Sequence, residues 1–187
     1  MPHNETEPMN EMWDSVRRTN LAGSIPNYIY GLKNEHSRYA FSTHTDNCME
    51  HVHTAGGVKY VNDSRACNVN AVWYTMQQIV GPIVWIAGGV STQLTHEWAD
   101  LTMVIQQKVT HIVVMGSHWQ HIVQNFSKRV VAIVRVDTME QAVYMARLLS
   151  NPGHTVLLSP GMASFDMFND LKDRGNKFRD AVLNVRR

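Results

Sequence analysis

The sequence predicts an α/β fold, with a doubly wound, mostly parallel, Rossmann-like sheet over residues 56–187. From Val58 onward, short β-branched runs alternate with segments of helical length, as in strands that are joined by crossover helices. The middle runs are apolar almost throughout and do not alternate with polar residues, which is typical of strands covered on both faces. The predicted strands are 58–61, 83–87, 111–115, 130–134 and 155–158.

Helices are predicted between these strands and after the last one, at 68–80, 97–108, 118–127, 138–150 and 174–185. The fourth helix has the clearest pattern, because Thr138 is a suitable N-cap and apolar residues follow at three-to-four spacing as far as Leu149. A turn sequence, Asn-Pro-Gly at 151–153, then ends the helix. The chain from Val58 is therefore predicted to be a βα repeat.

Residues 1–55 lack this repeat. They offer one short candidate helix face, built from Met12, Trp13, Val16 and Leu21, and the stretch 34–47 is polar. We expect an irregular appendage at 1–55 and one α/β domain at 56–187. A chain of 187 residues is long enough for such a domain to bury a core.

Composition and charge exclude several classes of protein. Hydrophobic residues make up 44% of the chain and charged residues 18%, which is the composition of a folded protein. Lys and Arg total 17 against 16 acidic residues, so the chain lacks the basic excess of proteins that bind nucleic acid broadly. The longest apolar run, 79–90, is too short to span a bilayer. With no secretory signal and two cysteines, the chain is expected to be cytoplasmic, with no nucleic-acid or membrane partner.

Polar loops follow three of the predicted strands, at the carboxyl ends where ligands bind in open α/β sheets. They are Asn62–Asn68, Ala87–Thr92 and Ser159–Asp166. The first and third carry carboxylates and hydroxyls, and the paired glycines of the second would let the backbone approach a ligand. Helix caps and turns also explain each loop taken alone, but three such loops at one sheet edge indicate a binding site.

Motifs in these loops resemble those of a known family. Residues 57–68 read GVKYVNDSRACN, close to GVxxINDSKATN, and 84–89 read VWIAGG, close to VVWIAGG. Residues 157–166 read LLSPGMASFD, close to LLSPACASFD, and 173–178 continue as in DRGxxF. The chain from residue 56 thus resembles the C-terminal domain of the UDP-N-acetylmuramoyl-L-alanine:D-glutamate ligases, the MurD-type Mur ligases of peptidoglycan synthesis. A weaker similarity of 32–39 to the family's central domain makes a remnant of that domain an alternative for 1–55.

The resemblance implies an ATP-dependent ligase that forms an amide bond. In the family, ATP with Mg phosphorylates the carboxylate of UDP-N-acetylmuramoyl-L-alanine, and the amine of D-glutamate attacks the acyl phosphate. The C-terminal domain closes over the nucleotide and holds D-glutamate. The resemblance implies nucleotide contacts at Asp63 and Cys48 and assigns no catalytic residue to this chain. It implies D-glutamate contacts at Arg65, Cys67, Thr92, Ser164, Phe165 and Leu171.

Several of these positions depart from the family pattern. Arg65 and Cys67 replace a lysine and a threonine, Thr92 replaces a lysine that would pair with the substrate carboxylate, and Cys48 replaces an arginine that would contact phosphate. The sequence also lacks GxxxxGK[ST] and the shorter Gly-Lys-Thr turn, which hold the phosphates of ATP. We expect a truncated or degenerate relative that is inactive as an isolated chain and binds neither ATP nor Mg tightly.

Two interpretations of the function stay open. The chain is either a fragment or degenerate paralogue of the ligase, with another polypeptide as the source of the missing domains, or a non-catalytic binding or interaction module that reuses the fold. The intact loop motifs favour the first, and the replaced lysine and arginine positions favour the second.

The histidines and tryptophans of the repeat have simpler interpretations. His118 and His121 share a helix face, and Cys48, His51 and His53 are close in sequence, but neither group completes a four-ligand pattern. No metal site is therefore predicted. Tryptophans on the predicted strands and helices are expected in the core, and they are Trp73, Trp85, Trp98 and Trp119.

Overall fold

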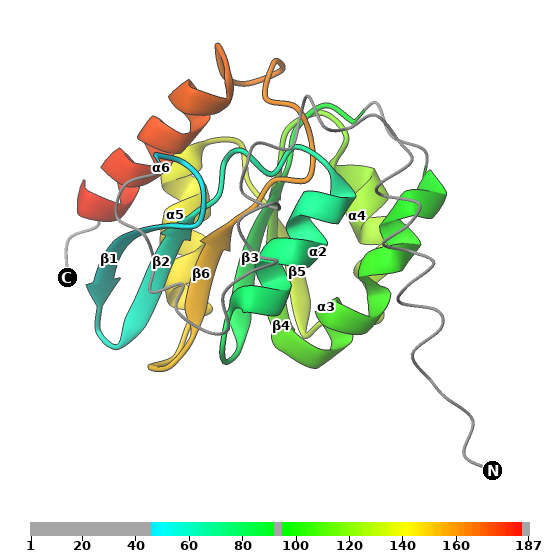
Figure 1. Ribbon diagram of the computed structural model, residues 1–187, viewed down its shortest axis with the longest axis horizontal. Helices are drawn as coiled ribbons and strands as arrows, with labels where there is room; N and C mark the ends of the chain where they lie inside the picture. Colours follow the sequence, from blue (N-terminus) through cyan, green and yellow to red (C-terminus); the bar gives the residue numbers. More distant parts are fainter. Residues whose placement is uncertain (1–45, 92–94, 185–187) are drawn as a thin grey trace, which may run out of the picture. The chain divides into compact units, whose positions relative to one another are not determined.

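The computed structural model describes residues 46–91 and 95–184, except for the side chains of 95–97 (Figure 1). These residues belong to one compact unit, Phe41–Arg187. The predictions for residues 1–45 and for Thr92 lie outside the described residues and stay predictions.

Six strands form one sheet in the spatial order β1-β2-β6-β3-β4-β5 (Figure 1). β1 pairs antiparallel with β2, and the other neighbouring pairs are parallel. The five predicted strands are confirmed, with small differences at their ends. The strands are β1 (Glu50–Ala55), β2 (Val58–Asn62), β3 (Ile83–Gly88), β4 (Val109–Met115), β5 (Ala132–Arg135) and β6 (Thr155–Leu158).

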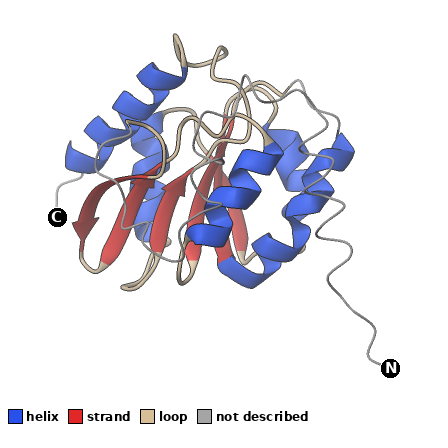
Figure 2. Cartoon of the chain, in the orientation of Figure 1, coloured by secondary structure: helices blue, strands red, loops and turns tan. Residues whose placement is uncertain are grey.

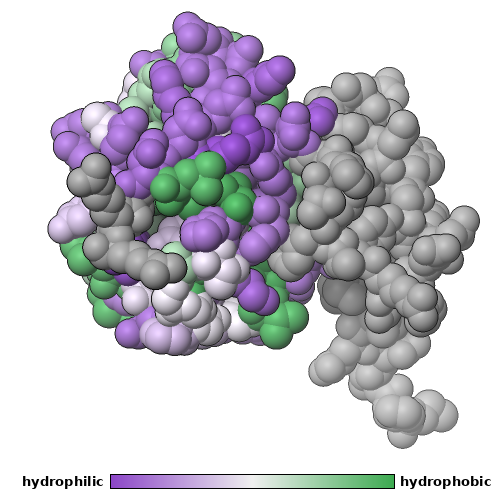
Figure 3. Space-filling model, turned by 90° about the vertical axis from the view of Figure 1, so that its left-hand side faces the viewer, coloured by the Kyte–Doolittle hydropathy of each residue, from purple (hydrophilic) through white to green (hydrophobic). Residues whose placement is uncertain are grey.

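β1 corrects the expectation that residues 50–55 are irregular. It turns into β2 through Gly56 and Gly57, whose φ angles of +58° and +77° suit glycine. The strand is polar and only partly buried, with His51 and His53 near its middle. Pairing with β2 holds this edge strand in place, so its sequence carries little of the apolar signal by which strands are predicted. The side of the molecule that carries β1 and α6 is mostly hydrophilic (Figure 3).

Helices cover both faces of the sheet, as a doubly wound fold requires (Figures 1 and 2). α2 (Val69–Gln78), α3 (Thr102–Lys108) and α4 (Trp119–Phe126) cover one face. α5 (Met139–Leu148) and α6 (Leu171–Asn184) cover the other. The helix predicted at 97–108 divides into a 3-10 helix, η3 (Thr95–Leu101), and α3.

Alternate residues of the central strands build two separate cores. Trp85 and Ile112 pack beneath α2, α3 and α4, whereas Val84 and Val113 pack beneath α5 and α6. All four side chains are fully buried. The nearly continuous apolar strands of the sequence are thus strands with a helix layer on each face, and the predicted fold class is confirmed.

The tryptophans belong mainly to the core beneath α2, α3 and α4. Trp85 and Trp98 are fully buried, and their ring centroids lie 6.4 Å apart. Phe126 packs edge-on against both, at 6.1 Å and 6.4 Å. Trp73 and Trp119 are partly buried against the same core. The core interpretation of the tryptophans is confirmed.

Candidate functional site

Main-chain hydrogen bonds join the loops at the carboxyl ends of the strands. The amide of Asp63 donates to the carbonyl of Leu158 at 2.7 Å, which ties the loop after β2 to the end of β6. Val90 and Ala163 exchange two hydrogen bonds of 3.0 Å, which tie the loop after β3 to the loop after β6. The three loops therefore meet at one sheet edge, at the top of Figure 1, as the sequence predicted.

The paired glycines of the loop after β3 serve backbone packing within the protein. A Cβ atom at Gly88 would lie 2.0 Å from the carbonyl oxygen of Met115, and one at Gly89 would lie 2.1 Å from that of Ala163. Their φ angles are +119° and +138°, which also favour glycine. The protein's own backbone therefore requires glycine at both positions, and the approach of a ligand to this loop stays a prediction.

Asp63 is a buried carboxylate that accepts hydrogen bonds from three groups. Its Oδ2 accepts from the hydroxyls of Thr75 and Ser159, and its Oδ1 accepts from the amide of Met49 at 3.2 Å. Burial raises the pKa of Asp63 to about 6, and the hydrogen bonds from Thr75, Met49 and Ser159 oppose this rise. The carboxylate at the position implied for nucleotide contact therefore joins β2, α2 and the loop after β6.

Cys48 lies close to this carboxylate. The thiol is half-buried, and burial together with the negative charge of Asp63 raises its pKa to about 11, with Arg65 acting in the opposite direction. Cys48 is thus a neutral thiol at physiological pH. It offers no positive charge to a phosphate at a position where the family pattern has an arginine.

Arg174 is a buried residue at this edge for which the sequence predicted no role. Its guanidinium is buried and donates to the Ser64 carbonyl at 2.8 Å, the Ser64 hydroxyl at 3.0 Å and the Met162 carbonyl at 2.9 Å. It also lies 3.3 Å from the sulfur of Cys67. Burial lowers the pKa of Arg174, whereas Cys67 and Asp166 raise it. Arg174 joins the loop after β2 to the loop after β6 from within α6.

The predicted D-glutamate residues divide into exposed and buried groups. Arg65 and Phe165 are exposed, and Phe165 keeps 76% of its surface accessible. Ser164 is buried, and Leu171 is 38% exposed. The carbonyl of Leu171 accepts from the Ser64 hydroxyl, and Cys67 contacts Arg174, so α6 and the loop after β2 are in direct contact. The structure therefore gathers the described members of the set at one edge.

A second polar network fixes the start of β1 to α6. Asn62 donates to the side chain of Asn47 at 2.9 Å and to the carbonyl of Gly175 at 3.2 Å. Glu50 accepts from Asn62 and from two nitrogens of Arg179, so the ion pair between Glu50 and Arg179 is bidentate. This network holds the first residue of the Asn-Asp-Ser motif in place.

Gly175 tests the tightness of this network. A Cβ atom at position 175 would lie 1.8 Å from the Oδ1 atom of Asn47. Gly175→Ala is expected to reduce the free energy of unfolding by about 2 kcal/mol, because overpacking outweighs the better helix propensity of alanine. Urea denaturation of the purified chain measures the change.

The background variant Asn47→Gly supplies the control, since it removes the clashing side chain and its φ of +61° suits glycine. In that background Gly175→Ala should cost less than about 0.5 kcal/mol. An equal cost in both backgrounds would show that Asn47 is not the obstacle.

The loop after β4 reaches the same edge. The Oδ2 atom of Asp166 accepts from the amide of Ser117 at 2.6 Å and from its hydroxyl at 2.9 Å. Gly116 lies tightly between this carboxylate and Gly89, since a Cβ atom there would be 2.7 Å and 2.6 Å from them. Sequence reasoning placed no residue of this loop at the site, because the loop is short and contains no family motif.

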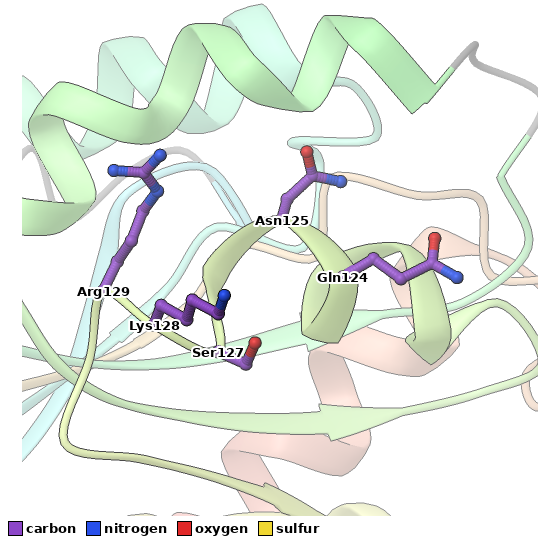
Figure 4. A pocket seen from close by; sticks show the side chains of 5 residues that line it. All are labelled: Gln124, Asn125, Ser127, Lys128 and Arg129. Carbon is purple, nitrogen blue, oxygen red and sulfur yellow. The ribbon is translucent and has the colours of Figure 1, made fainter.

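A surface hollow of about 310 Å³ lies at the end of α4, formed by Gln124, Asn125, Ser127, Lys128 and Arg129. These side chains spread along the helix end and do not converge on one point (Figure 4). Because α4 starts at the carboxyl end of β4 and runs back across the sheet, the hollow lies away from the loops of the candidate site. We therefore do not count it as part of that site.

Residues 46–91 and 95–184 contain no group of three His, Cys, Asp or Glu side chains placed to hold a metal ion. No helix in the same residues is both long enough and apolar enough to cross a membrane.

The fold and the loops define a doubly wound α/β domain with polar loops from four parallel strands at one edge. Residues 49–162 match the family model of the Mur ligase, glutamate ligase domain. The chain belongs to this Mur ligase family.

Curated relatives agree with this assignment, and a solved structure is similar in fold. The chain is 35% identical over 167 residues to the UDP-N-acetylmuramoylalanine--D-glutamate ligase of Christiangramia forsetii, and the match covers 88% of this chain and 37% of that protein. It is 39% identical to the Salinibacter ruber enzyme of the same name, over 72% of this chain and 29% of that protein. A murein peptide ligase structure from Psychrobacter arcticus is similar in fold at a TM-score of 0.51 and 8% identity, over 75% of this chain and 31% of the other. The chain thus spans about a third of the length of each of these proteins.

Proposed function

We propose that the chain is the D-glutamate-holding and nucleotide-closing part of an ATP-dependent, amide-forming ligase of peptidoglycan precursor synthesis. One observation carries the proposal. Two of the loops with family motifs, 62–68 and 159–166, lie side by side and share the hydrogen bonds of Arg174. The proposal extends to this chain the substrates in the names of its relatives, D-glutamate and UDP-N-acetylmuramoylalanine.

The exposed edge offers suitable groups for an amino acid with two carboxylates. The guanidinium of Arg65 is exposed and would pair with one carboxylate of D-glutamate. Ser164 and Leu171 flank the loop that would take the other carboxylate, and the exposed ring of Phe165 would cover the ligand. Cys67 would contact D-glutamate with a thiol in place of the family hydroxyl, and Thr92 would leave the ligand without one positive partner.

The nucleotide side is expected to be weak in the isolated chain. Asp63 already accepts three hydrogen bonds, so contact with ATP or its Mg ion would require the carboxylate to give up at least one of them. Cys48 adds no charge. We expect a dissociation constant for ATP in the millimolar range or weaker, about 4 kcal/mol of binding free energy at most. We also expect no ADP formation by the chain alone, because the phosphate-binding turn is missing from the sequence.

A triple variant tests the D-glutamate pocket. Thr92→Lys, Arg65→Lys and Cys67→Thr together restore the family residues, and we expect D-glutamate to bind about tenfold more tightly than to the parent chain. The physical reason is that a carboxylate leaving water gains a charge-assisted partner at position 92. Chemical-shift titration with D-glutamate measures the affinity of both proteins.

L-Glutamate is the control, because a new lysine attracts any dicarboxylate through its charge alone. Preference for the D-enantiomer would support the proposed function. Equal binding of both enantiomers, or of neither, would count against it and in favour of the interaction module that reuses the fold.

A further inference from the structure

His118 lies where three loops of the candidate site meet. It is the N-cap residue of α4, directly after the loop that follows β4. Its amide donates to the carbonyl of Gly89 at 3.0 Å, in the loop after β3. The preceding residue, Ser117, is bonded to Asp166 of the loop after β6. The main chain at His118 is therefore held among these loops.

The hydrogen bond between Ser91 and His118 determines where the imidazole carries its proton. The amide of Ser91 donates to Nδ1 of His118 at 2.8 Å. A backbone amide acts only as a donor, so Nδ1 must hold a lone pair and the ring proton must sit on Nε2. The same bond occupies the lone pair of Nδ1.

The Nε2–H group of His118 is not used in the hydrogen bonds of the described fold. It has no hydrogen-bond partner among the described residues. It is also not one of the buried polar atoms that lack a partner, so it is accessible to solvent. His121, whose ring centroid lies 5.7 Å away, differs because its Nδ1 atom is buried without a partner. His118 thus presents an accessible donor at the sheet edge, whereas His121 faces the interior through Nδ1.

We propose that His118 is a further ligand-binding residue of this edge, whose Nε2–H donates a hydrogen bond to an anionic oxygen of the bound ligand. This inference rests on the proposed function, under which the oxygen belongs either to a carboxylate of D-glutamate or to a phosphate of ATP. The start of α4 also favours negative charge, because the positive end of the helix dipole lies there. Ser91 acts by fixing the tautomer, so His118 needs no other residue to orient its donor.

The variant His118→Asn separates the two nitrogens of the ring. The Asn Oδ1 atom takes the place of Nδ1 and still accepts from Ser91, but no donor remains at the position of Nε2. We expect His118→Asn to bind the ligand about tenfold more weakly than the wild type, which is the loss of one charge-assisted hydrogen bond. Chemical-shift titrations with D-glutamate alone and with ATP alone identify the source of the oxygen. The amide signal of Ser91 in each protein reports whether the loop is still held.

The ring nitrogens of the wild type give a direct second measurement. We expect ¹⁵N spectra to show the proton on Nε2, and the Nε2 signal to move on addition of one of the two ligands. The matched control is His121→Asn, which should bind as the wild type does.

Unchanged affinity in His118→Asn would overturn the proposal. If the Ser91 signal changes in that variant, the wild-type ring decides, and an Nε2 signal that neither ligand moves would also overturn it. Failure of the proposed function is a different result, in which D-glutamate moves no signal in the loops 62–68 and 159–166.

Discussion

Replacing Arg174 with methionine is expected to reduce the free energy of unfolding by about 4 kcal/mol. The guanidinium satisfies two buried carbonyls, those of Ser64 and Met162, and the hydroxyl of Ser64. Methionine fills a similar volume but donates to none of them. The loss therefore combines charge-assisted hydrogen bonds with unsatisfied carbonyls in the two loops of the candidate site.

Urea denaturation of the wild type and of Arg174→Met measures this loss, and two variants serve as comparisons. Arg174→Lys keeps the charge but cannot reach all three acceptors. Its free energy of unfolding should therefore lie between those of the wild type and Arg174→Met, about 2 kcal/mol below the wild type. Arg129→Met replaces an exposed arginine and should change stability by less than about 0.5 kcal/mol. If Arg174→Met were as stable as Arg129→Met, Arg174 would not hold the loops together.

Arg174 also shows which part of the site can be predicted from the sequence alone. The buried stripe of α6 runs through Arg174, Phe178 and Val182 at helical spacing, so a charged residue on an apolar face is visible in the sequence. Its pairing with Ser64 is not visible, because Ser64 lies 110 residues away in the chain. Only the topology, which places β6 between β2 and β3, brings the partners together.

The remaining differences between prediction and structure have the same origin. The five apolar strands and their helices follow from local pattern, since burial on both faces requires nearly continuous apolar sequence. β1 is selected by its pairing with β2, and Gly88 and Gly89 are selected by the backbones of Met115 and Ala163. The contacts of the two glycines are long-range, and the hairpin pairing of β1 is made by its main chain, so neither leaves an apolar periodicity in the sequence. The loop motifs were predicted because their residues are contiguous in the chain.

Asp63→Asn is expected to abolish a pH dependence of stability worth up to about 3 kcal/mol. Burial raises the pKa of Asp63 from an ordinary value of 3.8 to about 6, so the folded chain binds this proton more tightly than the unfolded chain does. The stabilisation is therefore complete below pH 3.8 and is lost as the pH rises through about 6. Asparagine has no proton to lose, and its amide can donate to the hydroxyls of Thr75 and Ser159 while its oxygen accepts from Met49.

The measurement is the difference in free energy of unfolding between Asp63→Asn and the wild type, taken at several values from pH 4 to pH 7. Other titrating groups are common to both proteins and cancel in this difference, which should grow with pH in favour of the variant.

Thr75→Val provides the opposite test, because it removes a hydrogen bond that lowers the pKa of Asp63 and should therefore enlarge the pH dependence of stability. A difference that stays constant with pH, or a carboxyl titration midpoint of Asp63 near its ordinary value, would show that the carboxylate is ionised at little cost. Asp63 would then be available as the charged group that nucleotide contact requires. Under the expected result, the main role of Asp63 is to connect β2, α2 and the loop after β6 through its hydrogen bonds.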